Sequence, residues 1–125
     1  MLEKLAIVAL GGALGSALRF WTSQWAVDRF GADFPYGTLI VNVAGCFMIG
    51  CFMILSTERF LINPYWRLVF SVGFLGGLTT FSSFSYETLQ LMRDGSLLQA
   101  AMNVALNLGV GFAAAWTGMM AARAL

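Results

Sequence analysis

The chain has 125 residues, of which 59% are hydrophobic and only 10% are charged. Soluble domains carry about 25% charged residues, so this composition cannot provide a water-exposed surface around so large an apolar fraction. The net charge of +1 gives no support for a nucleic-acid partner, and the absence of histidine removes the commonest general base and transition-metal ligand. The composition therefore indicates an integral membrane protein with a single domain, residues 1–125.

Four stretches are long and apolar enough to cross a bilayer, which takes about 20 residues of helix. They cover residues 5–27, 37–56, 68–92 and 97–122. The segments between them contain both prolines and most of the charges, and tryptophans and tyrosines lie near the ends of the stretches, as in an aromatic belt. The sequence predicts an all-α membrane protein with four transmembrane helices and both termini on one side.

The first stretch begins like a signal peptide, because Lys4 precedes an apolar run that ends near a small-residue segment, Gly15-Ser16-Ala17. The apolar pattern resumes after Arg19 and three further stretches follow, so we expect a retained span. Arg19 itself has two interpretations. It either faces a cavity or a partner, or extends to the membrane interface as an anchor.

The second stretch contains Thr38 and Asn42, one helical turn apart on one face. An unpaired amide in hydrocarbon costs several kcal/mol. Asn42 is therefore expected either to bond to another helix or to donate into a polar pathway. Cys46 and Cys51 lie about 140° apart on this helix, so we do not expect them to pair with each other.

The third stretch contains "GFLGGLTTFSSFSYET", residues 73–88. Gly76-Gly77 has poor helix propensity, and Thr79-Thr80 can hydrogen-bond back to the chain. We therefore expect a broken third helix, with the break between Gly76 and Thr80. Broken backbone at membrane depth is tolerated only where it is buried in protein or lines a cavity, and its free carbonyls can bind a small cation.

Two aromatic rings follow this segment. Phe81 and Phe84 are three residues apart and share a helical face, with Ser82 on the adjacent face and Ser83 further round. Ring edges carry partial positive charge, so together with hydroxyl and amide donors they could line an anion path without any formal charge. The alternative is that the rings are helix packing and the serines join helices. Glu87 comes next and is expected to reach interfacial water.

The fourth stretch places Asn103 and Asn107 one turn apart on one face. One asparagine can be explained by packing, whereas two that align with hydroxyls of another helix are more typical of a polar track. Either interpretation remains open from the residues alone.

Positive charges are almost balanced between the two sides that four spans define. The side with the termini holds Lys4, Arg59, Arg67 and Arg123, and the other holds Arg29 and Arg93, with Arg19 if it lies near that end. This is a weak bias under the positive-inside rule, so the chain could insert in both orientations. The alternative is that charges beyond these counts settle a single orientation.

Three segments, "GGALGSALR", "GTLIVNVAG" and above all "GFLGGLTTFSSFSYET", resemble the bacterial fluoride channels of the Fluc/CrcB family. The resemblance covers all four stretches in order. It implies an antiparallel, dual-topology homodimer with two pores in the inner membrane of a bacterium. It also implies that fluoride leaves the cytoplasm passively, which protects the cell from fluoride.

The resemblance also implies roles for particular residues. The fluoride pore would be lined by Asn42, Phe81, Phe84, Ser82 and Ser83. A structural sodium ion would be held by the backbone carbonyls of Gly76 and Thr79 from both subunits. Arg19, Thr38 and Glu87 are further vestibule or structural candidates. The family often has tyrosine and serine near Asn103 and Asn107, so no fourth-span site is assigned.

Two other functions are considered. Small multidrug exporters also have four spans and can show dual topology, but they carry a membrane glutamate in the first span, and residues 5–27 contain none. A non-transporting assembly protein would use the polar residues only to join helices. An enzyme is not expected, because no nucleophile–base pair is visible.

Overall fold

The computed structural model describes all 125 residues and contains only helices and short connections. The α-helices are α1 (Leu2–Phe30), α2 (Tyr36–Ile54), α3 (Pro64–Arg67), α4 (Leu75–Leu78), α5 (Phe81–Arg93), α6 (Leu97–Ala105) and α7 (Gly111–Ala124). Three π-helical segments complete the structure. Leu55–Arg59 continues α2, Leu68–Phe74 joins α3 to α4, and Leu106–Val110 joins α6 to α7.

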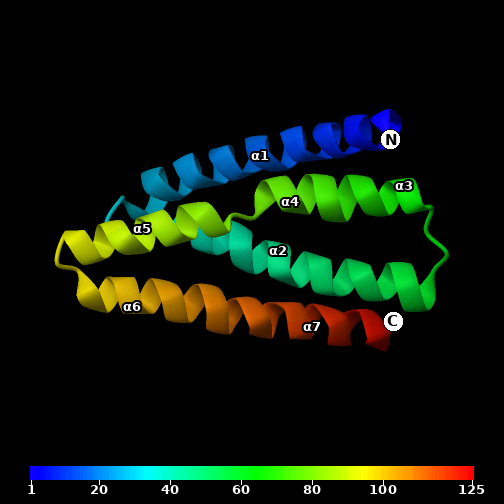
Figure 1. The fold of residues 1–125 in the computed structure, drawn as a ribbon. Coiled ribbons are helices and arrows are strands. Elements are labelled where there is room, and N and C mark those ends of the chain that lie inside the picture. Colours follow the sequence, from blue (N-terminus) through cyan, green and yellow to red (C-terminus); the bar gives the residue numbers. More distant parts are fainter.

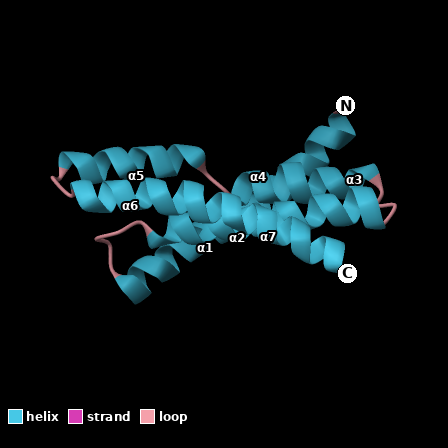
Figure 2. Cartoon of the chain, turned by 90° about the horizontal axis from the view of Figure 1, so that it is seen from below, coloured by secondary structure: helices cyan, strands magenta, loops and turns pink.

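These elements form four units long and apolar enough to cross a membrane: Leu2–Phe30, Tyr36–Arg59, Pro64–Arg93 and Leu97–Ala124. The expectation of an all-helical chain with four membrane-spanning helices is confirmed. The four units lie side by side, with the N- and C-termini at the same end (Figure 1). α1 packs against the segment from Leu68 to Leu78, α2 packs along α7, and α5 packs against α6. The α5–α6 pair diverges from the C-terminal part of α1 (Figure 2).

The distribution of polarity is that of a protein in lipid. Only 24 of the 125 residues are buried, and large apolar side chains cover the outside. The buried side chains include several hydroxyls and amides, among them Thr38, Thr80, Asn107 and Asn103, the last being fully buried. Because lipid tails are as apolar as leucine, apolar side chains can remain outside while hydrogen bonds and close packing join the helices.

Glycines permit the closest helix contacts. A Cβ atom at Gly15 of α1 would overlap the carbonyl oxygen of Phe74, and one at Gly118 of α7 would overlap the carbonyl oxygen of Phe47 in α2. Small residues allow backbones to approach in this way. The first half of the third span is therefore held against α1, and this contact positions the segment that follows α4.

Candidate functional site

The regular helix stops between α4 and α5, in the middle of the third span. Thr79 (φ −83°, ψ 155°) and Thr80 (φ −153°, ψ 114°) are both extended. The N–H of Thr80 does not donate to Gly76, as it would in a helix, but to Oδ1 of Asn42 at 2.8 Å. The N–H of Ser83 donates to Oγ1 of Thr80 at 3.1 Å, an N-cap that starts α5. The carbonyls of Gly76 and Thr79 are thereby left without their usual helical donors.

Asn42 of α2 lies beside this extended segment and bonds to both backbone polar groups of Thr80. Its Oδ1 accepts from the Thr80 N–H, and its Nδ2 donates to the Thr80 carbonyl oxygen at 3.1 Å. The same nitrogen donates to Oδ1 of Asn107 at 2.9 Å. Both amide protons of Asn42 are thus engaged within the chain. An anion that bound here would have to compete with the Thr80 carbonyl or with Asn107 for a proton.

The fourth span supplies two residues to this site, although no fourth-span site was assigned from the sequence. Nδ2 of Asn107 donates to the carbonyl oxygen and to Oδ1 of Asn103, at 2.9 and 3.0 Å. Nδ2 of Asn103 donates to Oγ1 of Thr88 at 2.9 Å, and Thr88 donates to the carbonyl oxygen of Phe84 at 2.7 Å. The one-turn spacing of the two asparagines was the signal for this arrangement. We call Thr80, Asn42, Asn107, Asn103 and Thr88 the asparagine chain.

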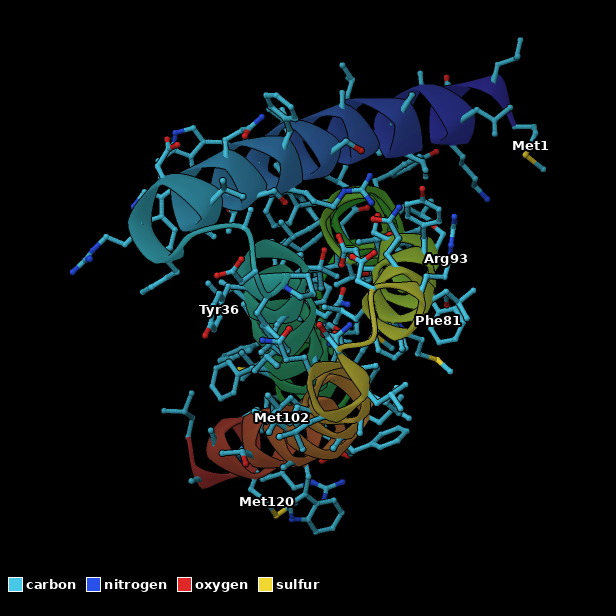
Figure 3. All side chains as sticks on the ribbon, turned by 90° about the vertical axis from the view of Figure 1, so that its left-hand side faces the viewer. Met1, Tyr36, Phe81, Arg93, Met102 and Met120 are labelled. Atoms are coloured by element: carbon cyan, nitrogen blue, oxygen red, sulfur yellow. The ribbon has the colours of Figure 1, made fainter.

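The two phenylalanines contact each other but occupy different environments. Their ring centroids are 5.5 Å apart and the rings are tilted by 59°. Phe84 is 6% exposed, whereas Phe81 is 74% exposed and lies on the outer side of α5 (Figure 3). Ser82 is exposed, with its hydroxyl 3.3 Å from that of Thr80, and Ser83 is half-buried. The predicted pore residues therefore lie together at the start of α5, with one ring inside the bundle and one on its surface.

An open groove of about 350 Å³ runs along this region. Its lining includes Asn42, Gly76, Thr79, Phe81, Phe84 and Asn107. It contains amides, hydroxyls, carbonyls and ring edges but no charged side chain. The groove can thus offer a small ion neutral polar partners, and it is open on one side of the single chain.

A second cavity, of about 530 Å³, lies where α5 diverges from α1, at the end of the bundle opposite the termini. Thr38 and Glu87 are among its lining residues, together with Asp33 and Asp94. The Thr38 hydroxyl donates to Oε1 of Glu87 at 2.9 Å, while the buried Oε2 of Glu87 has no partner in the chain. The structure brings Thr38 and Glu87 together at this cavity. Arg19 is half-buried on α1 and lines neither cavity.

Four apolar spans, three of which line an uncharged polar groove where one span leaves helical geometry, define a multi-pass α-helical membrane protein. The family model described as "CrcB-like protein, Camphor Resistance (CrcB)" matches residues 6–119. The chain belongs to the CrcB family, as its sequence motifs indicated.

Similar proteins extend over nearly the whole chain. The "Fluoride-specific ion channel FluC" of Sulfurihydrogenibium sp. (strain YO3AOP1) is 46% identical over 124 residues, which are 99% of this chain and 100% of that protein. The protein of the same name from Solibacter usitatus (strain Ellin6076) is 48% identical over 120 residues, 96% of this chain and 98% of the relative. A third, from Citrifermentans bemidjiense, is 47% identical over 124 residues.

Proposed function

We propose that this protein is a fluoride-selective channel through which cytoplasmic fluoride leaves a bacterial cell by passive electrodiffusion across the inner membrane. The observation that carries the proposal is the identity of 46% over 99% of the chain to a protein named as a fluoride-specific ion channel. In this proposal, hydrogen fluoride enters by diffusion, ionises in the neutral cytoplasm and leaves as the anion, so that the channel protects the cell from fluoride.

The chemistry of the groove supports an anion that gives up its water. Burying an isolated ion costs tens of kcal/mol, so the pore must replace hydration with several donors at once. The Asn42 amide of α2 and the rings of Phe81 and Phe84 line the groove, and the Ser82 and Ser83 hydroxyls lie in the same first turn of α5 as these rings without lining it. All of these partners are neutral. Neutral partners bind an ion moderately, which permits release as well as capture.

We propose that the functional unit is a homodimer of two antiparallel copies. The groove is open on one side of a single chain, and both Phe81 and Gly76 on its lining are exposed. A second copy against this face would close the groove and surround the ring of Phe81. The near balance of positive charges between the two ends of the bundle supports insertion in both orientations.

We further propose that the interruption of the third span provides a structural sodium site. The carbonyls of Gly76 and Thr79 have lost their helical donors to Asn42 and to the Thr80 side chain. Gly76 is exposed, and apart from its own stretch of chain no atom lies within 4 Å of the place that a Cβ atom there would occupy. Hard cations prefer such oxygen ligands. A bound sodium ion would supply positive charge where the two copies meet.

Reconstitution tests the proposed function directly. Purified protein in liposomes should release fluoride down its gradient, as followed with a fluoride-selective electrode, and should release little chloride under the same conditions. Empty liposomes provide the baseline. Fluoride release no faster than this baseline would refute the channel, and equal release of chloride would refute its selectivity.

A further inference from the structure

We infer that Asn107, held by Asn103, is a positioning residue that stabilises the orientation in which the Asn42 amide bonds to the Thr80 backbone, and thereby helps to fix the Thr79–Thr80 segment. The inference concerns the fourth span, and its consequence for transport rests on the proposed fluoride channel. It follows from the direction of each hydrogen bond in the asparagine chain.

The bonds run head to tail. The Thr80 N–H donates to Asn42, Asn42 donates to Asn107, and Asn107 donates to Asn103. Asn103 then donates to Thr88, and Thr88 donates to the carbonyl of Phe84. The asparagine chain therefore begins at the backbone N–H of Thr80, just before α5, and passes through the second and fourth spans. It ends at the backbone carbonyl of Phe84 in α5.

The backbone ends of this chain determine its direction. A carbonyl oxygen can only accept, so the Thr88 hydroxyl must give its proton to Phe84 and is left to accept from Asn103. That bond presents Oδ1 of Asn103 to Asn107, and the carbonyl of Asn103 accepts from the same nitrogen of Asn107. Asn107 consequently presents its own Oδ1 to Asn42.

The orientation of Asn42 follows from these contacts. An asparagine amide can turn by half a rotation and exchange its oxygen with its nitrogen, and only its partners decide between the two states. A turned Asn42 would place its oxygen against Oδ1 of Asn107 and against the Thr80 carbonyl, and its NH₂ group against the Thr80 N–H. Each of these pairs is repulsive, so Asn107 adds to the preference that the Thr80 backbone already gives for this orientation and holds the amide in it.

Asn107 has no proton to spare for an anion of its own. Both acceptors of its NH₂ group lie on Asn103, and its oxygen is covered by Asn42. The side chain is 8% exposed and that of Asn103 is fully buried. Its effect on the groove is therefore exerted through Asn42.

The test is a double-mutant cycle with Asn42→Ala, Asn107→Leu and the double variant, measured as fluoride release from liposomes. Leucine has the same number of side-chain heavy atoms as asparagine and the same branching, but cannot hydrogen-bond. Asn107→Leu should lower the release rate roughly tenfold, because Asn42 loses one of its three bonds and is held less firmly against Thr80, while the assembly elutes as before in gel filtration. The double variant should be no slower than Asn42→Ala. Thr117→Val is the matched control on the fourth span, because the Thr117 hydroxyl is exposed and bonds only to its own helix.

Losses that multiply in the double variant, or an Asn107→Leu rate equal to that of the unmodified protein, would overturn the inference. Thr88→Val is a milder change at the far end of the asparagine chain, and it replaces Asn107→Leu if that variant does not fold. A fluoride release rate unaffected by Thr88→Val would then contradict the positioning role. Melting temperatures in detergent, measured for the same three variants, separate the positioning role of Asn107 from the proposed fluoride channel. Coupling between residues 42 and 107 in melting, without any fluoride release from the unmodified protein, would refute the channel and retain the asparagine chain.

Discussion

The hydroxyl of Thr38 on α2 donates to Oε1 of Glu87 on α5 at 2.9 Å, at the cavity where α5 diverges from α1. Thr38 is only 4% exposed, and the second carboxylate oxygen of Glu87 is buried without a partner in the chain. The Thr38 hydroxyl is therefore the only protein donor to the Glu87 carboxylate.

Replacing Thr38 by valine should destabilise the protein by about 1–3 kcal/mol, because the substitution removes the donor and leaves both oxygens of the half-buried Glu87 carboxylate without a protein donor. Thermal unfolding in detergent measures the change. Thr57→Val is the matched control, because the Thr57 hydroxyl is exposed and bonds only to Met53 of its own helix. Equal melting temperatures for both variants would contradict the structural importance of the Thr38–Glu87 bond.

Phe81→Ile and Phe84→Ile should both reduce fluoride release, because each removes a ring edge from the groove. Their stabilities should differ. Phe84 is buried, so its truncation should also lower stability by about 1–2 kcal/mol, whereas the exposed Phe81 should leave the stability of a single chain unchanged. Phe112→Ile, at a ring that is 75% exposed on α7, is the control for a surface phenylalanine. Unchanged fluoride release in both variants would show that the rings do not contribute to the ion pathway.

Asn42→Asp should suppress fluoride release strongly. The aspartate would place an oxygen where Nδ2 now donates to Thr80 and Asn107, and it would introduce a negative charge beside an anion path. The matched control is Asn63→Asp, because Oδ1 of Asn63 caps α3 by accepting from Tyr65, and aspartate serves equally well at such a position. Electrode recordings of both variants make the comparison. A normal rate for Asn42→Asp would exclude this residue from the pathway.

Sodium should stabilise the assembled protein if the Gly76 and Thr79 carbonyls bind it, since a ligand that binds only the folded state raises stability with its concentration. The melting temperature in detergent should therefore be higher in sodium chloride than in the chloride of a bulky organic cation at the same ionic strength. Identical melting curves in the two salts would argue against the sodium site.

The general architecture could be predicted from the sequence because hydropathy and length determine which segments cross a bilayer. The partners of Asn42 could not, because they lie on other spans, at Thr80 and at Asn107, and their approach depends on tertiary packing. The spacing of Asn103 and Asn107 was visible, but the direction of their bonds was not. The spacing of Phe81 and Phe84 also predicted a shared face without revealing that one ring is buried and the other exposed, because burial depends on which spans pack against α5.

The π-helical segments were not predicted either. Leu106–Val110 contains Asn107, and its wider turn alters the angular position of that side chain relative to a regular helix. No local residue pattern marks such a turn, which arises where helix packing and hydrogen bonding make different demands on the backbone.

The glycine contacts described above divide the third span into two parts with different attachments. Its first half packs closely against α1 near Gly15, and its second half, α5, packs against α6. Two segments with different packing partners therefore meet at Thr79 and Thr80, and the only side chain of another span that hydrogen-bonds to the backbone there is that of Asn42. If the protein changes shape while it works, Thr79 and Thr80 are where the backbone would hinge, and loosening Asn42 would free that movement.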